Sequence, residues 1–342
     1  MRCVMDQSGH CERPARFDEV MLVETVAQAM VSSLLDAPSP KTVSASAQDA
    51  LRGLPKAPTP ADLETHRGMC ARVQRELGEI QLERHRVHMQ ESSIAGVPVR
   101  IFTPAEMPEG NRDRVLLNLH GGGFTVDAGS VTENVPVAAY ARMIVVAARY
   151  RMAPEHPFPA AVDDAEAVYR ALLADHAAER IGLYGTSAGA CLCAQLLVRL
   201  HLTGRPLPRA FGFFTGTADL SRSGDSEYFF RPAGDPTGIA DQFSAYVGDA
   251  DRSSPQISPI FSDLRGLPPT LCIAGTRDFM LSQTALFHHA LLHAGVDARL
   301  LVYEAMPHAH WIFLDLPESD QTFRAMAGFF SDRLRLMVSP DT

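Results

Sequence analysis

The chain has 342 residues, 46% of them hydrophobic and 21% charged, which is the composition of an ordinary folded protein. Its 40 acidic residues outnumber its 31 Lys and Arg residues, and the net charge of −9 would repel a phosphate backbone, so we expect no nucleic-acid partner. No apolar run reaches the roughly 20 residues that cross a bilayer, and the N-terminus has no apolar signal region. We therefore expect a cytoplasmic protein without membrane insertion, whose 6 Cys residues are reduced.

The first quarter of the chain is predicted to be helical. A helix over residues 17–36 carries a stripe of apolar side chains and ends before Pro38, because proline cannot continue a helix. Residues 37–60 are rich in proline and are predicted to be a linker. A second helix is expected over residues 60–78. We assign residues 1–83 to an N-terminal helical segment.

From residue 84 onward, short apolar runs alternate with helical stretches. The expected strands cover residues 84–90, 97–103, 115–119, 144–148, 181–184, 211–215, 271–274 and 300–303. The expected helices cover residues 134–142, 162–175, 188–203 and 281–294. This alternation predicts an α/β domain with a mostly parallel sheet, because fully buried parallel strands have continuous apolar sequences. Residues 216–262 interrupt it with a Gly- and Pro-rich stretch, and a loop of that length is typical of a functional insertion.

The motif Gly185-Thr186-Ser187-Ala188-Gly189 stands between an expected strand and an expected helix. In that context, G-x-S-x-G is typical of a nucleophile elbow. The sharp turn leaves room only for small residues beside the serine, and the free N–H groups at the helix start face developing negative charge. The competing interpretation is a generic Gly/Ser turn, but the strand before the motif and the helix after it favour the elbow.

A second glycine-rich segment, His120-Gly121-Gly122-Gly123, directly follows an expected strand. Glycine has no Cβ, so this run lets the backbone approach a ligand and present bare N–H groups. Near a nucleophile, such groups form an oxyanion hole. The spacings of the nucleotide-binding motifs are absent from this loop, which argues against a phosphate site. We expect His120 to hydrogen-bond the backbone and hold the loop rather than act as a base.

A serine hydrolase of this architecture requires an acid and then a histidine after the serine. Asp278 follows the expected strand 271–274, and His308 follows the expected strand 300–303. Open parallel sheets place their sites at the carboxyl ends of strands, so both positions are suitable. Asp278 is also compatible with a helix N-cap. His310 lies two residues beyond His308, and spacing does not decide between the two histidines.

The other candidate ligands do not predict a metal site. His289 and His293 are four residues apart on an expected helix, but no H-E-x-x-H motif and no third ligand accompany them. Cys191 and Cys193 also lie on an expected helix, where small buried thiols are the favoured interpretation. We therefore expect neither a metal nor a cofactor.

Taken in order over residues 84–336, these motifs resemble the α/β-hydrolase fold. Within that fold they are similar to the hormone-sensitive-lipase-like family of bacterial esterases, bacterial family IV, in its GTSAG variant. The run YRMAPEHPFPA, which begins at Tyr150, adds to the likeness. The resemblance implies about eight strands flanked by helices, with a catalytic domain over residues 84–342. It also implies a helical cap, to which residues 1–83 and the insertion 216–262 would contribute.

The resemblance further implies a role for each site residue. Ser187 would be the nucleophile, His308 the base and later the acid, and Asp278 the carboxylate that orients the imidazole. The implied donors of the oxyanion hole are the N–H groups of Gly122, Gly123 and Ala188. The commoner elbow, GDSAGG, has an acid where this chain has Thr186, so the hydrogen bonds beneath the nucleophile must differ.

The expected function is hydrolysis of small-molecule esters with short- to medium-chain acyl groups by a serine carboxylesterase. The same triad would serve amide or carbamate hydrolysis or acyl transfer. A small-molecule-binding protein on a hydrolase scaffold is a third reading, although the serine and the histidine are both present. A lipase acting at interfaces is disfavoured, because no strongly amphipathic basic helix is evident. The sequence leaves the oligomeric state open and is compatible with a homodimer.

Overall fold

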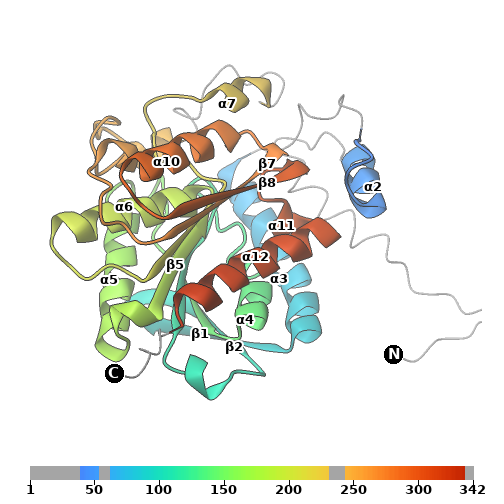
Figure 1. Ribbon diagram of the computed structural model, residues 1–342, viewed down its shortest axis with the longest axis horizontal. Coiled ribbons are helices and arrows are strands. Elements are labelled where there is room, and N and C mark those ends of the chain that lie inside the picture. The colour runs from blue at the N-terminus through green and yellow to red at the C-terminus, as the bar shows by residue number, and fades with distance from the viewer. Residues whose placement is uncertain (1–38, 54–61, 231–242, 336–342) are drawn as a thin grey trace, which may run out of the picture.

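The computed structural model describes residues 39–53, 62–230 and 243–335. Eight strands form one sheet in the order β1-β2-β4-β3-β5-β6-β7-β8, with helices on both faces (Figure 1). The β1–β2 and β2–β4 pairs are antiparallel, and the other neighbouring pairs are parallel. The strands are β1 (Val87–Ile94), β2 (Val97–Pro104), β3 (Val115–Leu119), β4 (Ile144–Ala148), β5 (Ile181–Thr186), β6 (Ala210–Phe214), β7 (Thr270–Arg277) and β8 (Ala298–Pro307). The predicted mostly parallel sheet of about eight strands is confirmed.

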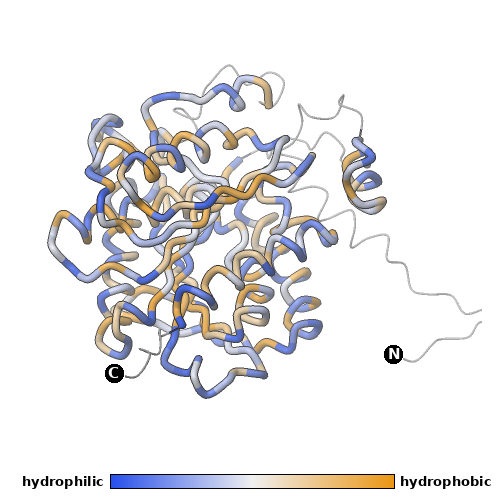
Figure 2. Tube along the Cα trace, in the orientation of Figure 1, coloured by the Kyte–Doolittle hydropathy of each residue, from blue (hydrophilic) through white to orange (hydrophobic). Residues whose placement is uncertain are grey.

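The central strands are buried on both faces, because successive side chains of a strand point to opposite sides of the sheet. In β3, for example, Leu117 joins the core on one face and Leu116 joins the core on the other. Figure 2 shows hydrophobic residues along these strands. The helices that cover the first face are α5 (Ala160–Asp175), α6 (Ala188–Leu202) and α10 (Leu281–His293). Those that cover the second face include α4 (Asn134–Ala141) and α12 (Pro317–Arg333).

The prediction of a linker over residues 37–60 is wrong for its middle part, which forms α2 (Ala45–Gly53). No proline lies between Pro40 and Pro55, so this interval contains no residue that would break a helix. The Ser44 hydroxyl accepts a hydrogen bond of 3.1 Å from a backbone N–H group in the first turn and so caps the helix.

The expected helix over residues 60–78 is present but longer, as α3 (Leu63–His85). Gly78 does not end it. This glycine is instead a point of close packing, because a Cβ placed there would lie 2.6 Å from the Val131 side chain. The helix predicted over residues 17–36 lies outside the described residues.

The insertion over residues 216–262 contains little regular structure where it is described. Its described part holds two short α-helices, α7 (Asp225–Phe229) and α9 (Ser244–Val247), and the 3-10 helix η3 (Pro259–Phe261), while residues 231–242 lie outside the described chain. After β8 the chain forms α11 (His310–Phe313), and α12 follows it; neither helix was predicted from the sequence.

Four of the parallel strands end at one edge of the sheet, and each is followed directly by a residue that the sequence analysis singled out. His120 follows β3, Ser187 follows β5, Asp278 follows β7 and His308 follows β8. Because these strands are parallel and lie side by side or separated by one strand, their carboxyl ends bring the four residues to the same edge.

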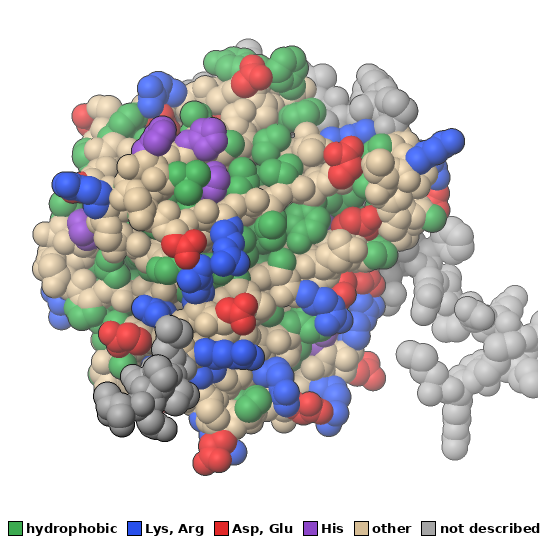
Figure 3. Space-filling model, viewed as in Figure 1, with side chains coloured by type: hydrophobic (Ala, Val, Ile, Leu, Met, Phe, Trp, Pro, Cys, Tyr) green, Lys and Arg blue, Asp and Glu red, His purple; other side chains and the backbone are tan. Residues whose placement is uncertain are grey.

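The molecular surface carries charges of both signs. On the face drawn in Figure 3, basic and acidic side chains are interspersed rather than gathered by sign. Within residues 39–53, 62–230 and 243–335, no helix has the length and apolar character needed to cross a membrane.

Candidate active site

Ser187 stands at the turn between β5 and α6 and is 7% exposed. Its φ of 58° and ψ of −123° lie in a region that residues other than glycine rarely adopt, so the turn is strained. The Ser187 N–H group donates a 2.9 Å hydrogen bond to the carbonyl of Phe214 at the end of β6. The predicted elbow conformation is therefore present, with the serine at the N-terminus of a helix.

Close backbone packing explains why the elbow motif needs glycine on both sides of the serine. A Cβ at Gly185 would lie 2.4 Å from the carbonyl oxygen of Gly189. A Cβ at Gly189 would lie 1.9 Å from the carbonyl oxygen of Leu119 at the end of β3. Either contact is far shorter than van der Waals distance, so a side chain at these positions would push the elbow away from its neighbouring strand.

The glycine-rich loop after β3 runs directly against the elbow. A Cβ at Gly121 would lie 2.8 Å from the carbonyl oxygen of Thr186 and 3.4 Å from Ser187 Cβ. Gly122 has a φ of 115°, and a Cβ there would meet the carbonyl oxygen of Val126 at 2.1 Å. Within the described residues, the N–H groups of Gly122 and Gly123 donate no backbone hydrogen bond. Both N–H groups are therefore without a backbone acceptor in the described part of the chain.

His120 holds this loop, as the sequence analysis expects. Its Nδ1 lies 2.9 Å from the Gly121 carbonyl oxygen. The ring stacks on Tyr150 with centroids 4.2 Å apart, and the Tyr150 hydroxyl donates a 2.7 Å hydrogen bond to the His120 carbonyl. His120 is thus fixed by its own loop and by the segment after β4, rather than directed at Ser187.

Asp278 and His308 form a buried pair. Asp278 Oδ1 lies 2.9 Å from His308 Nδ1, and the side chains are 0% and 1% exposed. Burial by itself raises the pKa of Asp278, but the adjacent His308 and hydrogen bonds from His308, Thr215 and Met280 outweigh it, so the pKa of this carboxyl is lowered. The carboxylate is therefore ionised and fixes one ring nitrogen of His308.

The other ring nitrogen of His308, Nε2, is buried and has no hydrogen-bond partner in the described part of the chain. No hydrogen bond to Ser187 is present in this structure. The two residues are nevertheless linked through the end of β6. The Ser187 N–H group donates a hydrogen bond to the Phe214 carbonyl, and the hydroxyl of the next residue, Thr215, lies 2.9 Å from His308 Nδ1. A serine hydroxyl or a reacting substrate would supply the hydrogen-bond partner that Nε2 lacks.

His310, the alternative that spacing left open, occupies a different environment. Its Nε2 lies 3.1 Å from the Thr322 hydroxyl, so this ring nitrogen is hydrogen-bonded to α12. Burial lowers the pKa of His310 to about 4, and the ring is therefore neutral at neutral pH. The histidine that Asp278 contacts is His308.

Two residues near the site were not found from the sequence. The Thr215 hydroxyl, at the end of β6, donates to Asp278 Oδ2 and also contacts His308. Glu133, just before α4, accepts a hydrogen bond from the Thr186 hydroxyl directly before the nucleophile. Neither residue lies in a recognisable motif, and only the pairing of distant strands and helices brings them to the site.

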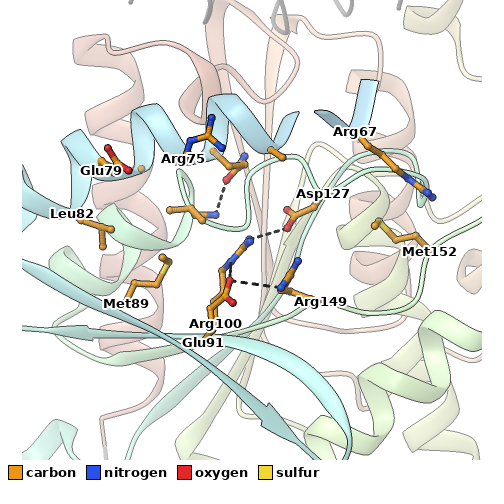
Figure 4. A pocket seen from close by; sticks show the side chains of 14 residues that line it. Arg67, Arg75, Glu79, Leu82, Met89, Glu91, Arg100, Asp127, Arg149 and Met152 are labelled. Carbon is orange, nitrogen blue, oxygen red and sulfur yellow. Dashed lines mark hydrogen bonds and ion pairs between the residues drawn. The ribbon is translucent and has the colours of Figure 1, made fainter. Parts of the chain in front are cut away.

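A cavity of about 400 Å³ lies between α3 and the β1–β2 hairpin, and Figure 4 shows the side chains that line it. Its polar groups are mostly ion-paired: Arg100 lies 3.0 Å from Asp127 and 3.4 Å from Glu91, and Arg149 lies 3.7 Å from Glu91. None of Ser187, Asp278 and His308 lines it. We therefore do not assign the ester-binding site to this cavity.

The remaining candidates have ordinary structural roles. His289 and His293 both lie on α10, and in the described part of the chain no group of three His, Cys, Asp or Glu side chains has the arrangement to hold a metal ion. Cys191 and Cys193 are buried free thiols on α6, as expected.

Known proteins are similar to this chain in fold and, over about two thirds of it, in sequence. A family model for the alpha/beta hydrolase fold matches residues 116–312. An acetyl-hydrolase of Streptomyces hygroscopicus is 33% identical over 223 residues, which cover 63% of this chain and 75% of that protein. Carboxylesterase NlhH of Mycobacterium tuberculosis is 31% identical over 255 residues, which cover 68% of this chain and 76% of that protein.

Solved structures extend the likeness to nearly the whole length. The crystal structure of an esterase, E25, matches with a TM-score of 0.78 and 31% identity, over 87% of this chain and 97% of that one. An esterase from the bacterial hormone-sensitive lipase family matches with a TM-score of 0.73 and 26% identity, over 94% of this chain and 100% of that one. The chain belongs to the α/β-hydrolase fold family and, within it, to the bacterial hormone-sensitive-lipase-like esterases.

Proposed function

We propose that this protein is a serine carboxylic-ester hydrolase with the triad Ser187, His308 and Asp278. The observation that carries the proposal is the Asp278–His308 pair. Its carboxylate fixes Nδ1 at 2.9 Å and leaves the buried Nε2 without a partner in the described part of the chain, at the same edge of the sheet as a serine held in a strained elbow. A ring oriented in this way can accept a proton only at Nε2, the nitrogen that Asp278 leaves free.

In the proposed reaction, Ser187 Oγ attacks the acyl carbon of the ester while His308 Nε2 takes the hydroxyl proton. Asp278 stabilises the imidazolium through Nδ1–H and does not itself take the proton. His308 then gives its proton to the departing alkoxide, and an acyl-serine remains. A water molecule, deprotonated by His308, attacks the acyl-serine and releases the carboxylic acid and the free serine.

The oxyanion hole is assigned to the N–H groups of Gly122, Gly123 and Ala188. The two glycine N–H groups form no backbone hydrogen bond and lie on a loop packed against the elbow, and Ala188 is the first residue of α6. Helix N-termini have unsatisfied N–H groups, which favour negative charge. By analogy with other acyl-transfer enzymes, each donor lowers the barrier by about 2.7–4 kcal/mol.

We assign short- to medium-chain acyl esters as substrates. Two similar proteins are named acetyl-hydrolase and carboxylesterase, which favours ester over amide substrates. Each methylene buried in the acyl pocket contributes about 0.8 kcal/mol, so kcat/KM is expected to rise about fourfold per methylene until the pocket is full. A series of p-nitrophenyl esters from acetate to palmitate, used below their aggregation limits, measures this. An optimum at palmitate with activation at an oil–water interface would identify a lipase instead.

We further propose that residues 1–83 and the insertion 216–262 form a cap over a catalytic domain that comprises residues 84–342. One side chain of α3 links the N-terminal segment to the proposed catalytic domain. Arg67 on α3 donates hydrogen bonds of 2.8 Å to the Thr125 carbonyl and 2.9 Å to the Ala153 carbonyl, so α3 braces the segment after the oxyanion loop.

The decisive test is covalent labelling of the serine. A fluorophosphonate ester should modify the protein once, at Ser187, and abolish p-nitrophenyl butyrate hydrolysis in proportion to the label. The Ser187→Ala variant should take up no label and lose activity by several orders of magnitude. Full activity of Ser187→Ala would reject the proposal. Faster turnover of matched anilides or carbamates than of esters would assign the same triad to the other substrate class.

A further inference from the structure

Glu133 is a buried carboxyl group, and its hydrogen-bond partners in the described part of the chain are all neutral. The residue is 0% exposed and directly precedes α4. Burial raises the pKa of Glu133, and the hydrogen bonds from Thr186, Trp311 and Asn118 oppose this rise without reversing it. Leaving such a group in the interior is costly unless its oxygens are well bonded. The bonds that this carboxyl makes therefore require explanation.

Three donors from three different elements converge on Glu133. Oε1 accepts from the Thr186 hydroxyl at the end of β5 and from the Trp311 indole N–H on α11 at 2.9 Å. Oε2 accepts from the Asn118 side-chain amide on β3 at 3.2 Å. An indole N–H can only donate, so Oε1 must be an acceptor towards Trp311.

A chain of further hydrogen bonds leads to the same carboxyl. Tyr184 donates to Asn134, and Asn134 donates at 2.9 Å to the Asn118 carbonyl oxygen. Asn118 in turn donates to Glu133. Every bond in the chain points towards Glu133, and hydrogen bonds aligned in one direction polarise and strengthen one another.

The two residues that share Oε1 belong to the two halves of the proposed triad. Thr186 directly precedes the nucleophile Ser187, whose φ is 58°. Trp311 lies three residues after His308, beyond Ala309, whose φ is 50°. Both catalytic residues thus stand at or beside a left-handed backbone position, which a non-glycine residue keeps only when its surroundings hold it there.

α11 cannot hold the histidine segment in place by itself. It has four residues, and a helix that short is not stable without tertiary contacts. The Trp311–Glu133 hydrogen bond ties this helix to the start of α4, and the Thr186–Glu133 hydrogen bond ties the elbow to the same atom. One oxygen therefore fixes the distance between the serine turn and the histidine turn.

We propose that Glu133 is a positioning residue. Its Oε1 atom accepts hydrogen bonds from both Thr186 and Trp311, and in this way it aligns Ser187 and His308 for proton transfer. This inference rests on the proposed serine-hydrolase function. Glu133 touches neither the substrate nor the reacting atoms. Its loss should therefore slow chemistry at correctly folded sites while leaving substrate binding almost unchanged.

The test compares Glu133→Ala with Glu133→Gln, with kinetics normalised to active sites titrated by the fluorophosphonate. For Glu133→Ala, kcat and the rate constant of Ser187 phosphonylation should fall together by about 10- to 100-fold, the range expected when buried donors lose their acceptor. KM should change less than about twofold. Glu133→Gln keeps an oxygen that Thr186 and Trp311 can share, so it should retain at least about one third of the wild-type kcat.

Two further sets of variants distinguish positioning from general stability. Gln195, buried on α6, accepts from Tyr246 and donates to the Ile257 carbonyl, far along the helix from the elbow. Gln195→Met should lower the melting temperature and leave kcat per titrated site within about twofold.

Thr186→Val and Trp311→Phe each remove one donor, and their effects on kcat should be non-additive, because both act through the same oxygen.

The outcomes separate the inference from the function that underlies it. If wild-type protein takes up no label and Ser187→Ala remains active, the serine-hydrolase proposal fails. Suppose instead that wild-type protein is labelled, but that Glu133→Ala only has fewer active sites that the fluorophosphonate titrates, or only a changed KM, with kcat per titrated site unchanged. The positioning role is then wrong, and Glu133 is purely structural. If Glu133→Ala does not fold, Thr186→Val and Trp311→Phe decide: strictly additive effects, or unchanged kcat in both variants, overturn the inference.

Discussion

Two carboxyl groups flank the nucleophile elbow, both 0% exposed, yet their environments shift their pKa values in opposite directions. Asp278 faces His308, a ring that can carry positive charge, and its pKa is lowered despite burial. Among the described residues, Glu133 accepts hydrogen bonds from the neutral donors of Thr186, Trp311 and Asn118, and burial raises its pKa. Burial is the largest influence on both groups, so the difference between them comes from the partner.

This contrast separates two uses of a buried carboxyl. At Asp278 the charge itself is needed, because it stabilises an imidazolium in the proposed reaction. At Glu133 an oxygen acceptor in the right place is sufficient, because neutral donors need an acceptor and not a charge. Removing only the charge should therefore be severe at Asp278 and mild at Glu133.

The largest effect is expected for Asp278→Asn, which removes the charge and keeps the shape. The amide favours the wrong tautomer of His308, and kcat/KM for p-nitrophenyl butyrate should fall by about 10⁴-fold at neutral pH, by analogy with other triads. The melting temperature should be measured beside the rate. A loss of less than tenfold in folded protein would contradict the role of Asp278 as the orienting carboxylate.

A smaller but distinct effect concerns His310, a buried ring whose main hydrogen-bond partner is the neutral Thr322 hydroxyl. Its pKa is about 4 in the folded state against 6.5 for an ordinary histidine, so the unfolded chain binds more protons between these values. As pH falls through this range, the folded state should lose about 3 kcal/mol of stability. Urea unfolding of wild type and His310→Gln between pH 7 and 4 measures it. The variant should lose less stability, and parallel curves would refute the explanation.

Thr215→Val tests whether Asp278 also depends on a neutral donor. The valine matches the threonine in shape but cannot donate to Oδ2, and a hydrogen bond to a charged group contributes about 1.5–3 kcal/mol. We expect kcat to fall about 10- to 100-fold and the acidic limb of the pH–rate profile to move. Thr217→Val, a matched buried change on the same segment, serves as the control. Equal effects of the two changes would assign Thr215 to stability alone.

The smallest effect is expected for removing only the charge at Glu133. Glu133→Gln should change kcat by less than about threefold and leave the pH–rate profile of kcat/KM unmoved, because the oxygen shared by Thr186 and Trp311 is kept. Stopped assays across pH 5–9 on titrated protein check this. A loss comparable to that of Asp278→Asn would show that the charge at Glu133 matters, and would remove the distinction between the two carboxyl groups.

Local patterns identified the elements whose burial is uniform. The runs over residues 115–119 and 144–148 match β3 and β4 residue for residue, because buried strands have nearly continuous apolar sequences, with Asn118 as the one polar residue of these two runs. The linker predicted over residues 37–60 was wrong in the middle, because its prolines flank α2 and do not interrupt it. Helix α12 was not predicted, although its apolar residues pack on the sheet.

By itself the sequence determined the order of the eight strands and of the helices α4, α5, α6 and α10 between them, the elbow around Ser187, the glycine loop after β3, and the two loops that carry Asp278 and His308. These features depend on residues adjacent in the chain, where turn geometry and hydrophobic periodicity act. Only the tertiary structure distinguishes the environments of His308 and His310, because it shows which ring meets Asp278 and which meets Thr322. It alone placed Glu133 under the elbow, since a hydrogen bond across 53 residues of chain leaves no trace in local spacing.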